Sequence, residues 1–518
     1  MRTVLSGGLL IDGLGGQGKG SVILRDDVIE AVLWGRACPR FEDAKVIDVT
    51  GRVVAPGLID MHSHDDVAAT DPDVYQAKIR QGVTTSLIGL DGLGYAPLDA
   101  QEYPRLKAYW TPVNGDPGPW ASHDLGAYRT LLQGQLGLNL VLGVPHGNLR
   151  LRYQGWSLNP LGRKDLDAMT AEVEQGLDQG AYGLTTGLGY VPGLAADQRE
   201  LLSLVEPLSA RRKLYVSHLR NYGRDILAAV DEAVELGRIK GVAVHLSHLH
   251  LSHPAMFGRA PELLERIHQA RAEGVAVTLD LYPYSAGSSI LHSYLPTWLL
   301  DGGPDLALSR LNDAQTVSRL RADPEVSSYD WSRVVITRTK SGNHVGQSVA
   351  RAAAERGLDA AECLATILSQ EALEVGAVVH QTLAADDMLL AEDQGAVVGS
   401  DGIGYGQLLH PRYYGAFAAF FERHVVERKT LSMAEALSKM STQTADIVGL
   451  RDRGRLQAGK AADVIVIDEE HFRPQSTYEH PRRFAEGVEY VFVNGTMSLA
   501  QGEFSPGLRP GRVLTPAP

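Results

Sequence analysis

The sequence predicts an α/β fold, namely a (β/α)8 TIM-type barrel with a small β-sandwich built from both termini. Two observations predict it: strand-like runs alternate with helical segments through the middle of the chain, and both ends are rich in short strands. A chain of 518 residues is also too long for one compact core unless that core is a large barrel with an added domain. We therefore expect residues 1–55 and 455–518 to form the small domain and residues 56–454 to form the barrel.

The small domain is predicted from short apolar runs separated by glycine and aspartate turns. No helical period appears in the first 55 residues, and Asn494-Gly495 is typical of a hairpin turn. The expected strands are Thr3–Ile11, Ser21–Leu24, Val28–Trp34, Ala44–Asp48, Val53–Val54, Asp463–Ile467 and Val488–Val493.

Eight apolar runs are candidate barrel strands. They are Leu58–His64, Thr84–Gly89, Leu138–His146, Tyr182–Leu188, Lys213–Leu219, Val242–Leu249, Val277–Tyr284 and Ala396–Asp401. Helical spacing fits between several of them: the apolar positions of 166–177 recur every three or four residues and end at Gly180, and a second helix from Ile226 is expected to end near Gly237. An insertion at about 285–345 adds more chain between the last two strands than a simple crossover needs, which is typical of a lid or a substrate wall.

Composition narrows the function. The chain is 44% hydrophobic and 21% charged, as in ordinary globular proteins, and its formal charge of −13, with no basic stripe, argues against a nucleic-acid partner. Cys38 and Cys363 are the only cysteines and form no thiolate zinc motif, which is consistent with a reducing compartment. No apolar run approaches the roughly 18 residues of a membrane span. We expect a cytoplasmic enzyme without a membrane partner, and a homo-oligomer is left open.

The most informative segment is Pro56–Asp66, which reads Pro-Gly-Leu-Ile-Asp-Met-His-Ser-His-Asp-Asp. In a strand, the i, i+2 spacing of His62 and His64 places both imidazoles on one face. At the carboxyl end of a barrel strand, that face is where active sites are built, and neutral imidazoles are ready ligands of zinc, manganese or iron. The pair therefore indicates a metal site.

Further candidate ligands end later strands. His218 lies at the end of strand five, and Asp401 ends strand eight in Gly-Ser-Asp-Gly. Strand six offers several histidines; alternation turns His245 to the opposite face from His248, while His250 shares the face of His248 but lies further out. Each residue alone has a structural explanation, but four histidines and an aspartate at strand ends together indicate a metal centre.

These motifs resemble the amidohydrolase superfamily, and Asp65-Asp66 is similar to its D-aminoacylase branch, the N-acyl-D-amino-acid deacylases. The resemblance implies that His62, His64, His218, His248 and Asp401 are metal ligands and that Asp401 also transfers the catalytic proton. The best-known D-aminoacylases carry a ligand cysteine where this chain has Asp91. Asp91 is therefore expected to be a ligand, the alternative being a turn residue in Asp-Gly. The resemblance implies Zn²⁺, as one or two ions, with Mn²⁺ or Fe²⁺ as substitutes.

The same resemblance assigns substrate contacts. Arg412 in His-Pro-Arg is expected to bind the substrate carboxylate, because a guanidinium pairs bidentately with a carboxylate. Tyr190, Tyr284 and Ser289 are expected to line the pocket, with barrel packing as the alternative role of the two tyrosines. His250 stands where the family often has a substrate-contacting lysine, and we expect it to contact substrate.

The expected function is metal-dependent hydrolysis of the linear amide bond of small-molecule N-acyl-D-amino acids, releasing a D-amino acid and a carboxylate. A cyclic-amide hydrolase similar to dihydroorotases and hydantoinases, or a peptidase acting on D- or iso-linked dipeptides, is left open, although no lysine ends strand four as it does in many binuclear relatives. A non-catalytic barrel that acts as a binding protein is the remote alternative. Residues 101–125 have no functional interpretation from sequence.

Overall fold

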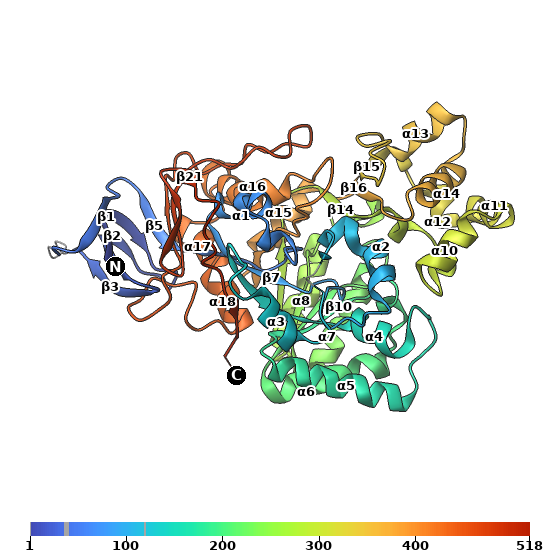
Figure 1. Cartoon of the computed structure of the whole chain (residues 1–518), viewed down its shortest axis with the longest axis horizontal. Helices are drawn as coiled ribbons and strands as arrows, with labels where there is room; N and C mark the ends of the chain where they lie inside the picture. Colours follow the sequence, from blue (N-terminus) through green and yellow to red (C-terminus); the bar gives the residue numbers. More distant parts are fainter. Residues whose placement is uncertain (1, 36–40, 119–120, 518) are drawn as a thin grey trace.

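The computed structural model describes residues 2–35, 41–118 and 121–517, so Cys38 lies outside the described residues. Strands from both ends of the chain form one terminal sheet at the left of Figure 1, the barrel occupies the middle, and an insertion extends at the upper right. Within the described residues, no helix combines the length and the apolar character that crossing a membrane requires.

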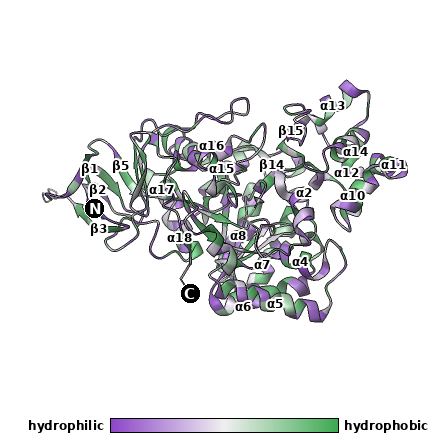
Figure 2. Cartoon of the chain, in the orientation of Figure 1, coloured by the Kyte–Doolittle hydropathy of each residue, from purple (hydrophilic) through white to green (hydrophobic). Residues whose placement is uncertain are grey.

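The terminal sheet has nine strands in the order β21-β20-β19-β18-β5-β1-β2-β3, with β4 paired to β1. These strands are β1 (Arg2–Ile11), β2 (Gln17–Arg25), β3 (Val28–Trp34), β4 (Ala44–Asp48), β5 (Val53–Pro56), β18 (Val464–Ile467), β19 (Val488–Val493), β20 (Thr496–Ala500) and β21 (Glu503–Phe504). A register shift between Ser6 and Gly8 lets β1 pair first with β4 and then with β5. The sheet has an apolar core of its own, seen as green strands in Figure 2, while Ile465 and Val491 belong to the barrel core.

Eight parallel strands form the barrel, and all but β7 are shorter than the sequence predicts. They are β6 (Leu58–Asp60), β7 (Val83–Ile88), β8 with β9 (Asn139–Leu142, Val144–Pro145), β10 (Gly183–Gly187), β11 (Leu214–His218), β12 (Ala243–Leu246), β13 (Val277–Leu281) and β17 (Ala396–Val398). Only Gly143 separates β8 from β9, and the β6–β17 seam is joined by hydrogen bonds from Met61 N to Val398 O (3.2 Å) and from Asp401 N to His62 O (2.8 Å). The ring is therefore closed. The short strand β22 (Val513–Leu514) covers the outer edge of β8.

Helices surround the barrel. They are α1 (Pro72–Ile79), α2 (Tyr103–Asn114), α3 (Leu125–Leu132), α4 (His146–Gln154), α5 (Arg163–Asp178), α6 (Gln198–Arg211), α7 (Ile226–Lys240), α8 (Ala260–Ala272), α15 (Ala384–Glu392), α16 (Arg412–Phe421), α17 (Met433–Lys439) and α18 (Thr442–Val448). The expected end of α7 near Gly237 is wrong: the helix continues to Gly241, whose φ of +66° caps it. A side chain at Gly237 would press on Val275 and Val244, so this glycine serves close packing on the barrel.

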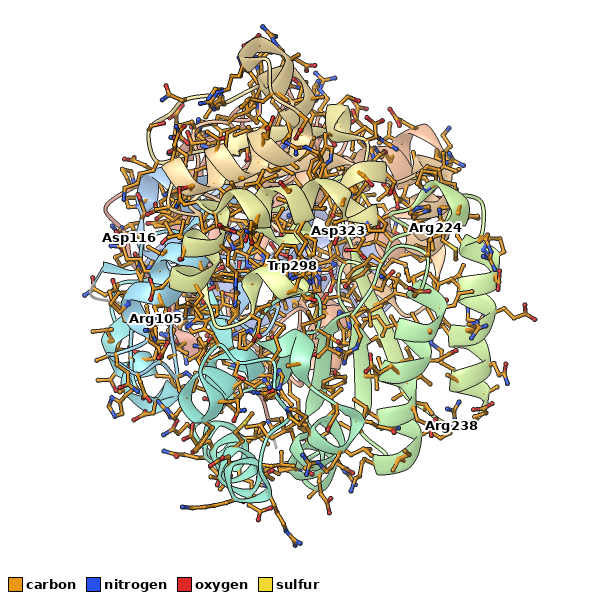
Figure 3. The ribbon with its side chains drawn as sticks, turned by 90° about the vertical axis from the view of Figure 1, so that its right-hand side faces the viewer. Arg105, Asp116, Arg224, Arg238, Trp298 and Asp323 are labelled. Carbon is orange, nitrogen blue, oxygen red and sulfur yellow. The ribbon has the colours of Figure 1, made fainter. Side chains whose placement is uncertain are left out.

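The insertion between β13 and β17 is longer than the expected 285–345, because strand β16 (Gly376–His380) pairs with both β14 (Ala286–Ile290) and β15 (Val334–Arg338). Its helices are α9 (Thr297–Leu300), α10 (Pro304–Leu311), α11 (Ala314–Ala322), α12 (Pro324–Ser328), α13 (Val349–Arg356) and α14 (Ala360–Gln370), the last containing the buried Cys363. Figure 3 shows this insertion, with Trp298 and Asp323, in front of the barrel. The insertion packs on α2, and α2 carries Asn114, which contacts the candidate ligand His64. The insertion therefore covers the side of the barrel where the candidate ligands lie.

Candidate metal centre

The six residues predicted as metal ligands lie together at the carboxyl ends of the barrel strands. His62 and His64 follow β6, Asp91 follows β7, His218 ends β11, His248 follows β12 and Asp401 follows β17. They form two groups whose ligand atoms lie within 4.8 Å of one another. The groups are His62, His64, Asp91 and Asp401, and Asp91, His218 and His248.

Asp91 belongs to both groups. Its Oδ1 lies 3.4 Å from His62 Nε2, 3.5 Å from His218 Nδ1 and 3.5 Å from His248 Nε2, and its Oδ2 lies 3.7 Å from His64 Nε2. This position between the two groups is the one from which a carboxylate can bridge two ions or serve either alone.

Several of these atoms are buried without a hydrogen-bond partner. They include both ring nitrogens of His62, Oδ1 of Asp91 and Nδ1 of His248. Buried polar atoms normally have partners, and converging exceptions of this kind are typical of a site that binds an ion. Burial alone would lower the pKa of His62, but the carboxylates of Asp280 and Asp91 raise it well above its usual value. The cluster therefore favours a positive charge at its centre, and its imidazole and carboxylate donors suit a divalent metal.

The backbone is unusual at three of the six residues. Asp91, His248 and Asp401 have φ values of +55°, +32° and +46°, in the left-handed region that non-glycine residues seldom adopt. Such conformations cluster at functional sites, where the surroundings hold them. Gly187 on β10 contributes here, because any side chain at this position would overlap Asp91 O.

Asp401 connects the cluster to Arg412. Its Oδ1 lies 3.1 Å from His64 Nε2, and its Oδ2 lies 2.8 Å from Arg412 Nη1. Burial would raise the pKa of Asp401, but the Arg412 guanidinium and the neighbouring histidines lower it below its usual range. The carboxylate is therefore held ionised, as a proton acceptor must be.

Two residues that sequence reasoning missed orient the predicted ligands. Asn114 Oδ1 lies 2.9 Å from His64 Nδ1 and comes from α2, within the uninterpreted segment 101–125. Asp280 on β13 accepts a hydrogen bond from His248 N (3.0 Å), and its Oδ2 lies 3.6 Å from His62 Nδ1. The Asn114 contact is of the kind that fixes the ring orientation of a metal-binding histidine, whereas Asp280 holds the His248 backbone and places a carboxylate beside the His62 ring. The only sequence signal for Asp280 is a carboxylate inside an apolar strand, and Asn114 has none.

A second buried charge cluster lies beside the first. Lys78 on α1 donates to Asp60 Oδ2 and to Ser400 Oγ (2.7 Å), and its Nζ lies 3.5 Å from Asp65 Oδ2. Asp60 Oδ1 in turn accepts from the backbone N–H groups of Ser400 (2.8 Å) and His62 (3.3 Å). This Lys78 cluster therefore ties together the backbone segments that carry His62 and Asp401.

A cavity of about 270 Å³ opens beside the candidate ligands Asp91, His218, His248 and Asp401. Tyr190 and Ser289 both line it and share a hydrogen bond of 2.9 Å between their hydroxyl oxygens. His250 also lines it, stacked on Tyr222 at 5.0 Å between ring centroids. Burial lowers the pKa of His250 to about 3, so its ring is neutral.

The structure places two of the predicted substrate contacts away from the cavity lining. Tyr284 packs against His410 (5.4 Å between ring centroids) and Tyr478, and the neighbouring Tyr282 lines the cavity instead. The reason is that β13 ends at Leu281 and Tyr284 N donates to Tyr282 O (3.0 Å), so strand alternation does not extend to these tyrosines. Arg412 is fully buried beneath the lining. Its Cζ lies 4.4 Å from the centroid of the Tyr282 ring, and its Nη2 donates to Ser288 O (3.3 Å).

A family profile, curated sequences and a solved structure resemble this chain over most of its length. The amidohydrolase family profile matches residues 45–498. An N-acyl-D-glutamate deacylase and a D-aminoacylase, both of Alcaligenes xylosoxydans xylosoxydans, are 34% and 30% identical to this chain, covering 99% of it and 96% and 97% of their own lengths. The crystal structure of N-acyl-D-glutamate deacylase from Bordetella bronchiseptica, complexed with zinc and a phosphonate inhibitor, has a TM-score of 0.84 at 30% identity and covers 99% of each chain.

Proposed function

This chain belongs to the amidohydrolase family, and from that premise we propose that it hydrolyses the amide bond of N-acyl-D-amino acids, releasing a carboxylate and a D-amino acid. The observation that carries the proposal is the cluster of six candidate ligands, with its partnerless buried atoms, beside a cavity of small-molecule size. The substrates named for the two curated relatives support the choice of a linear N-acyl-D-amino acid.

The proposed metal ligands are His62, His64, Asp91, His218, His248 and Asp401, and zinc is the ion that the related deacylase structure contains. When bound, a divalent ion supplies a Lewis acid that polarises a carbonyl and lowers the pKa of water. The shared position of Asp91 provides for one ion or two.

Asp401 is the proposed proton carrier. Because Arg412 and the neighbouring histidines keep it ionised, its carboxylate accepts a proton from the attacking water and later delivers that proton to the departing amine nitrogen. Arg412 holds one oxygen of this carboxylate, which leaves the other oxygen, on the His64 side, to face the reacting atoms.

The proposed substrate contacts are Arg412, Tyr190, Ser289, His250 and, in place of Tyr284, Tyr282. Arg412 lies beneath the lining, against the Tyr282 ring, and its Nε has no hydrogen-bond partner. This donor serves the α-carboxylate of a substrate that reaches past Tyr282. The hydroxyl pair of Tyr190 and Ser289 offers donors to the polar atoms of the acylated amino acid. We place the enzyme in the cytoplasm, since the sequence has two cysteines, too few for a disulfide framework.

The test is turnover of N-acetyl-D- and N-acetyl-L-amino acids by purified protein before and after treatment with a chelator. We expect hydrolysis of D-substrates, little of their L-enantiomers, loss of activity on chelation and recovery with Zn²⁺. A matched panel of hydantoins and D-dipeptides serves as control. Faster turnover of that panel than of every N-acetyl-D-amino acid would overturn the proposal.

A further inference from the structure

The charges around the cavity determine which substrate side chain it accepts. Among the described residues that line it, the carboxylates are Asp91 and Asp401, both candidate ligands, and the one guanidinium is that of Arg220; no lysine is present in this lining. A substrate with a carboxylate on its side chain would have to find its counter-charge here.

Arg220 is already occupied. Its Nε lies 3.0 Å from Glu232 Oε2 and its Nη2 lies 2.8 Å from Glu232 Oε1, a two-point pairing across the guanidinium fork. Its Nη1 donates to Leu194 O (2.7 Å) and its Nη2 also donates to Ala196 O (2.9 Å). Glu232 on α7 therefore compensates the charge of Arg220, and the Leu194 and Ala196 carbonyls occupy its remaining donors.

The remaining polar groups at the accessible part of the lining are neutral. They are the half-buried side chains of Asn221, Tyr222, Ser252, Ser288, Ser289, Ser293, Tyr294 and Gln381. Such hydroxyls and amides hydrogen-bond well to amides and hydroxyls, but they do not neutralise a carboxylate, which loses part of its hydration on entering the cavity.

We infer that this enzyme prefers N-acyl-D-amino acids with uncharged side chains and discriminates against D-glutamate and D-aspartate, because Glu232 neutralises the one guanidinium in the cavity lining. The inference rests on the proposed function. The inferred preference differs from the substrate for which a 34%-identical relative, an N-acyl-D-glutamate deacylase, is named.

The experiment compares kcat/KM for N-acetyl-D-glutamine and N-acetyl-D-glutamate, which differ in charge and hardly in shape, and repeats it for asparagine and aspartate. The assays are run at pH 8, where an imidazole of ordinary pKa is neutral. We expect the amide of each pair to be preferred by roughly 10- to 100-fold, the scale of leaving one charged group without a partner. Hydrolysis of N-acetyl-D-leucine or N-acetyl-D-methionine without either acidic substrate also supports the inference.

Two failures are distinguishable. Equal or faster turnover of N-acetyl-D-glutamate overturns this inference and leaves the proposed function standing. Absence of turnover with every N-acyl-D-amino acid overturns the proposed function, and the inference with it.

The residue-level test is Glu232→Gln, which removes the counter-charge of Arg220 and keeps the shape. We expect the glutamine-to-glutamate ratio of kcat/KM to fall by about three- to tenfold. The matched control is Glu273→Gln, since Glu273 Oε2 pairs with Nε and Nη2 of Arg238 in the same manner. Figure 3 shows where the control pair lies relative to the insertion. Arg238 is at the end of α7 far from the insertion, whereas Arg224, just before α7, marks the end on the insertion side. An unchanged ratio in a folded Glu232→Gln protein would overturn the role of Glu232.

Discussion

Two clusters of buried charge lie side by side at the end of strand β6, and they differ in how well their atoms are satisfied. In the Lys78 cluster, every carboxylate oxygen of Asp60 and Asp65 has a donor, including Ser400, Ser86 and Tyr413. In the ligand cluster, His62 and Asp91 leave buried atoms without hydrogen bonds. A satisfied buried charge network stabilises one backbone arrangement, whereas converging polar atoms without hydrogen-bond partners mark a place for a ligand.

The largest expected effect is on turnover in the ligand cluster. Asp401→Asn removes the proton acceptor, so kcat should fall by on the order of 10²–10⁴. The control is Asp65→Asn in the Lys78 cluster, which should lower the melting temperature more and kcat far less. If the two variants lose kcat equally, the functional distinction between the clusters is wrong.

The next effect is on stability in the Lys78 cluster. Lys78→Met leaves Asp60 buried without its cation and should lower the free energy of unfolding by about 3–5 kcal/mol, measured by urea titration. Adding Asp60→Asn removes the unpaired charge, so the double variant should recover part of the loss. If the Lys78→Met protein is as stable as the native protein, the Lys78–Asp60 pair does not contribute to the free energy of unfolding.

Arg412 has two proposed roles. It pairs with the proton carrier Asp401, and it binds the α-carboxylate of the substrate. If it binds the α-carboxylate, Arg412→Ala should raise KM by roughly 10- to 100-fold for free N-acyl-D-amino acids, and carboxyl-blocked substrates should lose little more in the variant. Equal losses of kcat on free and blocked substrates would instead assign Arg412 to positioning Asp401 alone.

A variant at Asn114 tests whether a residue outside the ligand cluster contributes to metal binding by holding the His64 ring. Asn114→Ala removes the partner of His64 Nδ1 and should weaken metal binding by roughly 10- to 100-fold, measured by competition with a chromogenic chelator. Asn139→Ala is the control, because this buried amide bonds to Asp463 in the terminal part of the chain. Similar losses in both variants would indicate a general folding defect.

The smallest effect concerns Asp387, a buried carboxylate with one side-chain donor, Thr382 Oγ1 at 2.7 Å. Burial raises its pKa from an ordinary value near 4 to about 7. A raised carboxyl pKa favours the protonated form in the folded state, so this residue costs stability as pH rises from about 4 to about 7. Asp387→Asn should therefore stabilise the protein by roughly 1–3 kcal/mol at pH 8 and by less at pH 5. An equal change at both pH values would contradict the raised pKa.

The sequence predicted much of this molecule. The eight-fold alternation of strands and helices requires only local periodicity, and each barrel strand lies within the range expected for it or within one residue of it. Four histidines and Asp401 were candidates because of their places at strand ends, since parallel strands in a closed barrel bring their carboxyl ends to one face. Asp91, and the choice of His248 among the histidines of strand six, came from the resemblance to D-aminoacylases. The length of the insertion and the end of α7 were mispredicted, since both depend on what packs against them.

Strand-helix alternation therefore predicted the barrel, and histidines at strand ends indicated a metal centre. The class of reaction to test came from the resemblance of these motifs to the amidohydrolase superfamily. Only the tertiary structure decided that Asp91 lies between both ligand groups, that Asn114 and Asp280 orient the histidines, and that Tyr282 rather than Tyr284 lines the cavity. It also decided that Glu232 compensates Arg220. The physical reason is that local pattern sets which way a strand or helix faces, whereas a contact between distant segments depends on packing and backbone turns that no local period encodes.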